Sequence, residues 1–380
     1  MKKIHVAFIG YGYRGKQLFR LVADIPFFRA VAVADPCLSV EERPGVACYA
    51  DGEDGYLRML DEQKPDLVFV SSPWNCHVRH ALACVQRHCR VALEIKGGLY
   101  KHEYKSLMEC ASHEGIRVYP LENTLFLKEI QSVWHMVQAG VLGELVYMRG
   151  GYRHDLRNIL LDDSGCMGGR GGTESVWRSR FYQTRNADIY PTHGLAPLFM
   201  MAGIGRTDRV ERLTSFSTKA VGLHQRINEL GGDVAQTVAL GDVVSTQMET
   251  RNGLLLSLTH DTTLPRPRGL DFEVQGTKGI WKGDERKIYI EGVGKTETWV
   301  SDETYVNRYE TEYWKRWGDE ALACDMHHWG MDYIMLKALE ADWKEEIPYP
   351  VTLTDLAAWA AVTPLSQKSI SGHCSVPFEI

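Results

Sequence analysis

The sequence predicts an α/β protein with an N-terminal Rossmann dinucleotide-binding domain and a C-terminal α+β domain that contains a large, mostly antiparallel open sheet. Three observations lead to this prediction. Short apolar strands alternate with helical segments over the first 120 residues, longer extended runs with hairpin turns follow, and 380 residues exceed what one hydrophobic core usually serves. We therefore expect one domain over residues 1–122 and a second over residues 123–380.

The strands of the first domain are short and strongly apolar. They are "IHVAFIG", "AVAVAD", "DLVFVSS", "RVALEI" and "IRVYPLEN". Connecting segments such as 16–23 and 76–87 have helical patterns. Strands that alternate with helices in this way form a parallel sheet covered on both faces.

The second domain begins with a predicted helix over 128–139, which Gly140 ends. Two hairpins follow, one in "TQMETRNGLLLSLTH" around Asn252 and Gly253, the other in "FEVQGTKGIWKG" around Gly276 and Gly279. Helices over 326–343 and 352–371 are expected to close the structure. The glycine-rich stretch "DSGCMGGRGGTE" is expected to be a mobile loop.

Composition and charge exclude several classes of partner. A net charge of −6 over the chain argues against nucleic acid, which needs a concentrated basic surface. No run of about 18 apolar residues is present, so we expect no membrane span. The first residues, "MKKIHVAFIGYGYRG", indicate a strand and not a secretory signal. Nine cysteines without a CxxC pair favour a reducing, cytoplasmic compartment, and a periplasmic location stays open if a leader was removed.

One cluster of metal-ligand residue types lies in "NCHVRHALACVQRHC". His77, His80, Cys84 and His88 would share one face of a helix. No carboxylate or cysteine pair completes the coordination, so we predict a helix after a strand and no metal site.

A glycine fingerprint follows the first strand at Gly10, Gly12 and Gly15. The first glycine permits a tight turn, the second lets a pyrophosphate approach the backbone, and the third lets helix and strand pack closely. Asp35 ends the second strand 20 residues later, where a carboxylate can bind the adenosine ribose and repel a 2′-phosphate. This pattern predicts NAD as cofactor; the alternative for Asp35 is a turn former before Pro36.

Further residues of the cofactor site are expected in the fingerprint loop and at the carboxyl ends of the neighbouring strands, which line one crevice. They are Tyr13, Arg14, Ser72, Trp74, His77, Glu94 and Asn123. The alternative for Asn123 is an ordinary helix cap.

Two chemically active side chains lie close together in "NADIYPTHGLAP", where Pro191 separates Tyr190 from Thr192 and His193. A helix can begin at the histidine, and a histidine near a helix N-terminus is disfavoured as imidazolium and stays available as a neutral base. From the residues alone, a buried structural role for the tyrosine and the histidine is the alternative.

Several stretches resemble known families. "FIGYGYRG", "SSPWNCHVRHA" and "VALEIKGG" are similar to the glucose–fructose oxidoreductase and inositol dehydrogenase superfamily. "PLENTLFLKEIQSVWHMVQAGVLGEL", "GGYRHDLR", "RNADIYPTHGLAP" and "AAVTPLSQKSISG" resemble, more narrowly, glycoside hydrolase family 109. That family is known for NAD-dependent α-N-acetylgalactosaminidases, and the resemblance covers nearly the whole chain.

The chain departs from these families at two places. Many dehydrogenases of the superfamily have Glu-Lys-Pro after the fourth strand, with the lysine assisting proton transfer, whereas this chain has Glu94, Ile95 and Lys96. The hydrolase family usually has an apolar residue followed by proline there, so Lys96 departs from both patterns. Ala196 replaces a glycine that is usual in the hydrolase family.

The resemblance implies a retaining glycosidase that oxidises C3 of the sugar, eliminates the C1 substituent, adds water and reduces C3 again. It implies that His193 takes the C3 hydroxyl proton, that Tyr190 contacts the same oxygen, and that Tyr152 is the base at C2 or the donor to the leaving group. Sugar-binding roles are implied for Asn123, His154, Arg157 and Arg178.

The resemblance also implies a homo-oligomer, with the second domain carrying both the substrate site and the subunit contacts, and a sugar or glycoconjugate as substrate. The alternatives are a sugar dehydrogenase that releases NADH and a cofactor-holding sugar sensor without turnover.

Overall fold

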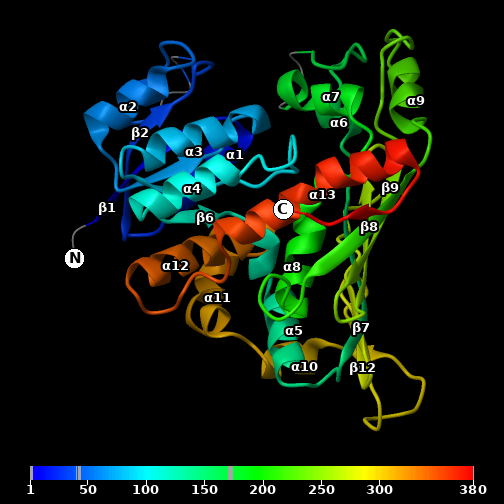
Figure 1. Cartoon of the computed structure of the whole chain (residues 1–380). Helices are drawn as coiled ribbons and strands as arrows, with labels where there is room; N and C mark the ends of the chain where they lie inside the picture. Colours follow the sequence, from blue (N-terminus) through cyan, green and yellow to red (C-terminus); the bar gives the residue numbers. More distant parts are fainter. Residues whose placement is uncertain (1–2, 40, 42–43, 170–173, 380) are drawn as a thin grey trace. The chain divides into compact units, whose positions relative to one another are not determined.

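The computed structural model describes residues 3–39, 41, 44–169 and 174–379 (Figure 1). These residues form two compact units. The first unit takes its residues from 1–95, 102–126 and 312–357, and the second from 96–101, 127–311 and 358–380. Each unit is thus assembled from three separate stretches of the chain.

The first unit contains a six-stranded parallel sheet with the order β3-β2-β1-β4-β5-β6. Its strands are β1 (Ile4–Ile9), β2 (Phe28–Ala34), β3 (Ala47–Tyr49), β4 (Leu67–Val70), β5 (Arg90–Leu93) and β6 (Val118–Pro120). This order is that of the Rossmann fold, with its crevice between β1 and β4, where the order reverses. The predicted Rossmann fold is confirmed, although the three-residue strand β3 was not expected.

Helices alternate with most of these strands along the chain. They are α1 (Tyr13–Ala23), α2 (Gly55–Gln63), α3 (His77–Val85) and α4 (Lys105–Glu114), with short 3₁₀ turns η1 (Trp74–Cys76) and η2 (Asn123–Phe126). The chain returns to the first unit with α11 (Glu312–Cys324), η3 (Met326–His328) and α12 (Met331–Trp343).

The prediction of a continuous helix over 326–343 is wrong for its first residues, where the chain forms the 3₁₀ turn η3. The backbone at Trp329 and Gly330 is left-handed, with φ of 49° and 79°. Residues in this conformation end a right-handed helix, so α12 begins only at Met331.

The second unit contains a nine-stranded sheet with the order β14-β13-β12-β11-β7-β10-β9-β8-β15. Its strands are β7 (Leu145–Arg153), β8 (Val210–Ser217), β9 (Val243–Thr250), β10 (Leu255–Asp261), β11 (Glu273–Gly276), β12 (Gly279–Lys282), β13 (Lys287–Ile290), β14 (Val300–Ser301) and β15 (Val376–Pro377). All neighbours are antiparallel except β7 and β10. The mostly antiparallel sheet and both hairpins are confirmed.

Helices of the second unit include α8, which packs on β7 and β10 (Figure 1). The helices are α5 (Lys128–Gln138), α6 (Arg157–Leu160), α7 (Ser175–Thr184), α8 (Thr192–Ala202), α9 (Gly222–Glu229), α10 (Glu303–Arg308) and, from Ala358 onward, α13 (Leu353–Gly372). On β10, Leu256, Leu258 and His260 alternate onto the buried face. This face of the sheet carries the residues considered below.

Residues 170–173 of the expected mobile loop lie outside the described residues. None of the helices in the described part of the chain is long and apolar enough to cross a bilayer.

Candidate active site

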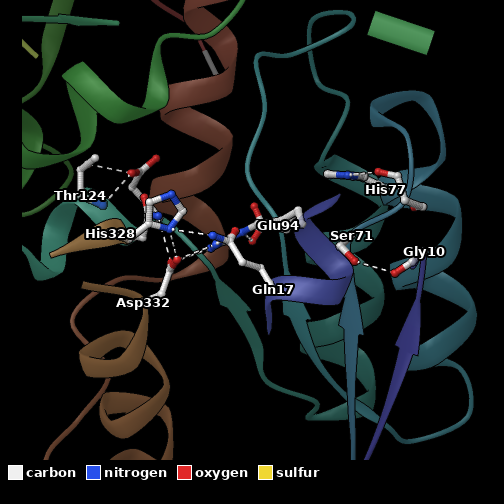
Figure 2. Close-up of polar contacts among 12 residues, drawn as sticks. Gly10, Gln17, Ser71, His77, Glu94, Thr124, His328 and Asp332 are labelled. Atoms are coloured by element: carbon white, nitrogen blue, oxygen red, sulfur yellow. Dashed lines mark hydrogen bonds and ion pairs between the residues drawn. The ribbon is translucent and has the colours of Figure 1, made fainter. Parts of the chain in front are cut away.

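The glycine fingerprint forms a loop in which two of the three glycines leave no room for a side chain. Gly10 has a left-handed φ of 93°, and a Cβ on it would lie 2.6 Å from the backbone nitrogen of Ser72. A Cβ on Gly15 would lie 2.2 Å from the carbonyl oxygen of Gly10. Ser71 donates its hydroxyl to that same carbonyl oxygen over 2.9 Å (Figure 2). Helix α1 therefore starts in direct contact with the end of β1.

The second glycine faces open space. No heavy atom lies within 4 Å of a Cβ built on Gly12, which is exposed and precedes α1. The first turn of α1 carries no acidic residue, and no side chain caps it. The first amides of a helix have no partner within the helix and carry the positive end of its dipole. The loop therefore fits the pyrophosphate of a dinucleotide.

Asp35 holds the fingerprint loop as well as the turn that follows β2. Its carboxylate accepts hydrogen bonds from the backbone N–H of Tyr11 over 2.6 Å and of Cys37 over 2.8 Å. A carboxylate offers about four acceptor positions, so two more hydrogen bonds can still be accepted. Both readings of this residue, ribose binding and turn formation, are compatible with its position.

Arg14 and Glu94, both expected in the cofactor site, are bonded to each other. The Arg14 Nε donates to Glu94 over 2.7 Å, and its two terminal nitrogens donate to Asp332 over 2.6 and 2.7 Å. His328 also bonds Asp332 (Figure 2). Burial opposes ionisation of Asp332, but the charge of Arg14 prevails and holds the pKa of this carboxyl well below its usual range.

Asn123 has one satisfied and one unsatisfied polar atom. Its amide Nδ2 donates to Asp332 over 3.0 Å, which fixes which end of the side chain is the nitrogen. The buried Oδ1 has no partner among the described residues. A buried acceptor without a partner is expected to bind water or a ligand. Asn123 therefore remains a candidate for binding substrate or cofactor.

The histidines at the start of α3 bind protein groups. His77 Nε2 lies 2.7 Å from the Ser72 carbonyl oxygen, and His80 Nδ1 lies 2.9 Å from the Ser72 hydroxyl. Helix α3 ends at Val85, and His88 has a left-handed φ of 56°. The four residues of the considered metal cluster therefore do not share one helical face. Trp74 is buried in η1, just after Ser72.

A different group, Asp325, His328 and Asp332, places its ligand atoms within 4.8 Å of one another. The guanidinium of Arg14 already provides the positive charge that balances Asp332. Burial and the nearby Asp332 raise the pKa of Asp325 to about 6. We assign an ion-pair network, and no metal, to this group.

In the second unit, three residues that lie far apart in the sequence form one aromatic cluster, the Tyr152–Tyr190–His193 cluster. Ring centroids are 4.7 Å apart for Tyr152 and Tyr190, 5.0 Å for Tyr190 and His193, and 5.4 Å for Tyr152 and His193. Tyr152 and His193 are buried, and Tyr190 is partly exposed. The structure thus brings together all three residues that were predicted to be catalytic.

Glycines explain how α8 can bring His193 so close to β7. A Cβ on Gly194 would lie 2.4 Å from the backbone nitrogen of Gly151, and a Cβ on Gly150 would lie 2.5 Å from the carbonyl oxygen of Gly194. Backbone therefore packs directly against backbone at this point. The two glycines before Tyr152 and the one after His193 set the spacing of the cluster.

The stretch after β5 contacts the segment that carries Tyr190. A Cβ on Gly97 would lie 2.3 Å from the carbonyl oxygen of Ile189. Lys96 is fully buried, and its Nζ donates to the Gly97 carbonyl over 3.4 Å. Ile95, at the position where the superfamily's dehydrogenases have lysine, is also buried.

Of three predicted sugar-binding residues, two contact the aromatic cluster and one pairs with a neighbour along the chain. The Arg178 guanidinium is buried, pairs with Glu174 and lies 5.4 Å from the centre of the Tyr190 ring. The His154 ring centre lies 6.2 Å from that of Tyr152, and burial, together with nearby arginines, lowers its pKa. Arg157 forms its ion pair with the neighbouring Asp155.

One residue near the cluster was not predicted. His260 on β10 is the register partner of Tyr152 on β7, and their ring centroids are 6.4 Å apart. Neither of its ring nitrogens has a hydrogen-bond partner among the described residues. The signal in the sequence was a histidine that takes the apolar position of the alternating run "LLLSLTH".

Comparisons with known proteins identify the family of the chain. Residues 4–118 match "Oxidoreductase family, NAD-binding Rossmann fold", and residues 126–379 match "Glycosyl hydrolase 109, C-terminal domain". A glycosyl hydrolase family 109 protein of Stenotrophomonas maltophilia is 32% identical over 97% of this chain and 87% of its own length. An alpha-N-acetylgalactosaminidase of Tannerella forsythia is 31% identical over 97% and 84%.

Solved structures show the same fold at low sequence identity. A levoglucosan dehydrogenase in complex with NADH and levoglucosan has a TM-score of 0.71 at 15% identity, and the match covers 100% of each chain. A myo-inositol 2-dehydrogenase from Lactobacillus plantarum has a TM-score of 0.67 at 14% identity, also over 100% of each chain. The protein therefore belongs to the glycosyl hydrolase 109 family and is a glycosidase with an NAD-binding Rossmann domain.

Proposed function

We propose that the protein hydrolyses α-N-acetylgalactosaminides with retention, through oxidation at C3, elimination across C1 and C2, addition of water and reduction. The observation that carries this proposal is the mutual contact of Tyr152, Tyr190 and His193 in a family 109 chain. The Tannerella forsythia relative, which is named an alpha-N-acetylgalactosaminidase, supports the choice of sugar.

NAD, when bound, would supply the reversible hydride acceptor that the oxidation and later reduction at C3 require. The residues that would hold it are Gly10, Gly12, Tyr13, Arg14, Gly15, Asp35, Ser72, Trp74, His77, Glu94 and Asn123. The open space over Gly12 and the unsatisfied Oδ1 of Asn123 are the structural features that fit such a ligand.

His193 is proposed to take the proton of the C3 hydroxyl. It is the second residue of α8, and its ring contacts those of Tyr190 and Tyr152, so its imidazole lies where the proposed base is needed. Tyr190 contacts His193 and would donate a hydrogen bond to the same oxygen. Together the two side chains would hold and release one proton at C3.

Tyr152 is proposed to act one carbon further along the ring, at C2. A ketone at C3 makes the hydrogen on C2 acidic. Loss of this hydrogen as a proton expels the substituent on C1, which takes up a proton and leaves as an alcohol. Water then adds at C1, and the proton returns to C2, so the sum of the steps is hydrolysis. The buried cation Arg178 interacts electrostatically with Tyr152 and can stabilise negative charge that develops there.

His154, Arg157 and Arg178, with Asn123, are proposed to bind the sugar. Of these, His154 and Arg178 contact the tyrosines of the cluster directly. A homo-oligomer is proposed because the family resemblance implies one.

A sugar dehydrogenase that releases NADH is the second candidate, because the solved structures with this fold include sugar and inositol dehydrogenases. The buried Ile95 stands where those enzymes' lysine is expected, which favours the hydrolase.

Deuterium incorporation separates the candidates. The protein is incubated in heavy water with an aryl α-N-acetylgalactosaminide and no added NAD, and aglycone release, absorbance at 340 nm and deuterium at C2 are followed. The proposed cycle releases the aglycone, labels C2 and accumulates no NADH beyond the enzyme concentration.

The other outcomes identify other functions. A dehydrogenase needs added NAD and accumulates NADH without releasing the aglycone, and a sensor does neither. Aglycone release without label at C2 would indicate direct displacement at C1 and would contradict the redox cycle.

A further inference from the structure

His260 lies where the sheet of the second unit meets the aromatic cluster. It is the sixth residue of β10 and pairs in register with Tyr152 on the parallel neighbour β7. Register partners on adjacent strands point to the same face of a sheet, so His260 and Tyr152 share the buried face on which α8 packs. Its side chain is 1% exposed.

No described residue uses the hydrogen-bonding capacity of His260. Both Nδ1 and Nε2 are buried, and neither has a partner among the described residues. A neutral imidazole has one donor and one acceptor nitrogen, and leaving both unpaired in a protein interior is costly. Two other buried histidines each have at least one bonded nitrogen: His80 Nδ1 bonds the Ser72 hydroxyl, and His77 Nε2 bonds the Ser72 carbonyl. Both nitrogens of His260 are therefore left for a partner that is not among the described residues.

The environment favours a neutral partner that both donates and accepts. Burial, with a smaller contribution from Arg178, lowers the pKa of His260 to about 3, so the ring is uncharged at neutral pH. An uncharged ring does not form an ion pair with an anion. An amide group matches it, because a carbonyl oxygen accepts a hydrogen bond and an N–H donates one.

We propose that His260 is a substrate-binding residue that hydrogen-bonds the acetamido group on C2 of the sugar. This inference rests on the proposed function, in which Tyr152 acts at C2. The ring centre of His260 lies 6.4 Å from that of Tyr152, the residue proposed to act at C2, so a group on C2 would be the part of the sugar nearest to it. The residue would thereby select N-acetylgalactosaminides over galactosides.

The test compares His260→Phe, which keeps a planar ring and removes both polar atoms, with His260→Asn, which keeps a donor and an acceptor. Thr246→Val is the control, since Thr246 is a fully buried residue of β9 that is bonded to Ser215. Each variant is assayed with aryl α-N-acetylgalactosaminide and aryl α-galactoside, and calorimetry measures binding of N-acetylgalactosamine and galactose. Melting temperature and bound NAD report folding.

We expect His260→Phe to raise KM for the acetamido sugar and weaken its binding about tenfold, with melting temperature and NAD content retained. Galactose and its glycoside should be affected much less, so discrimination falls. His260→Asn should recover part of the loss, and Thr246→Val should leave discrimination unchanged. Unchanged discrimination in His260→Phe, or an equal loss for both sugars, would overturn the inference.

Failure of the proposed function gives a different result. If wild-type protein binds N-acetylgalactosamine through His260 but releases no aglycone, the hydrolase proposal fails and the binding role stands. If the wild type binds neither sugar, both fail. If neither variant folds, the imidazole ¹⁵N signal of His260 is measured in the wild-type protein. The proposal requires this signal to shift when N-acetylgalactosamine is added and to stay in place when galactose is added.

Discussion

Arg14 and Asp332, 318 residues apart in the sequence, form a two-pronged ion pair with N–O distances of 2.6 and 2.7 Å. The Asp332 side chain is fully buried, and Arg14 is the second residue of α1, directly after the exposed Gly12 and Tyr13. Helix α12 thus fixes the start of the helix that is expected to meet the cofactor phosphates. Asp332 of the C-terminal part of the chain thus holds Arg14, which follows the fingerprint glycine Gly12.

Asp332→Asn should lower the free energy of unfolding by about 3–5 kcal/mol, because it removes the fully buried carboxylate that pairs with both terminal nitrogens of Arg14 and leaves Glu94 to balance the charge. Denaturant unfolding measures the change. The control is Asp51→Asn, whose partner Arg58 forms an ion pair in which both side chains are about half exposed. That variant should lose less than about 1 kcal/mol. Equal losses in the two variants would contradict the importance of the buried pair.

Gly194→Ala should reduce turnover by more than about tenfold while bound NAD is retained. Alanine is the better helix former by about 1 kcal/mol, so helix propensity alone predicts a small gain in stability. The added Cβ would lie 2.4 Å from the Gly151 nitrogen, which forces α8 away from β7 and separates His193 from Tyr152. Gly45→Ala is the control because no atom of the described residues lies within 4 Å of a Cβ built there. Wild-type turnover in Gly194→Ala would show that the close packing does not set the geometry.

His193→Ala should lower turnover by about 10² to 10⁴-fold, the usual contribution of a general base. NAD content should not change, because the proposed role is proton transfer at the substrate. Aglycone release and acid-released cofactor are measured on the same sample. A variant with near wild-type turnover would mean that His193 is a structural member of the aromatic cluster.

Asp188→Asn should stabilise the protein above neutral pH. Burial raises the pKa of Asp188 to about 7 from 3.8, and one carboxylate oxygen has no partner among the described residues. The folded state therefore retains a proton that the unfolded state loses, so stability falls as pH rises from about 4 to 7. Asparagine cannot ionise and keeps an acceptor for the Tyr190 N–H.

The melting temperature of Asp188→Asn should exceed that of wild type by several degrees at pH 8 and converge with it near pH 4. An equal difference at both pH values would show that ionisation of Asp188 is not the cause.

Purified protein should already contain NAD, since a cofactor that is regenerated in each cycle gains nothing by dissociating. Acid release followed by mass analysis identifies the dinucleotide. NADP in place of NAD would contradict the role given to Asp35, whose carboxylate should repel a 2′-phosphate.

The sequence by itself determined features that depend on neighbours along the chain. Alternation of apolar strands with helices predicts the parallel sheet, and Asn252-Gly253 predicts a hairpin, in which Gly253 takes a left-handed φ of 86°. The glycine fingerprint and the motif around Tyr190 and His193 are equally local. Such patterns determine the local backbone conformation and the spacing of buried side chains along the chain. They can therefore be recognised without knowledge of the fold.

Only the tertiary structure decided which distant residues meet. The sequence predicts Arg14 in the cofactor site, and only the fold shows that it also bonds Asp332. His260 has the pattern of a core residue, and only the fold shows that both of its nitrogens lack a partner among the described residues. The segment 312–357 belongs to the first unit although residues of the second unit precede it. The physical reason is that ion pairing, burial and close backbone packing are set by contacts between segments hundreds of residues apart, to which local propensity contributes almost nothing.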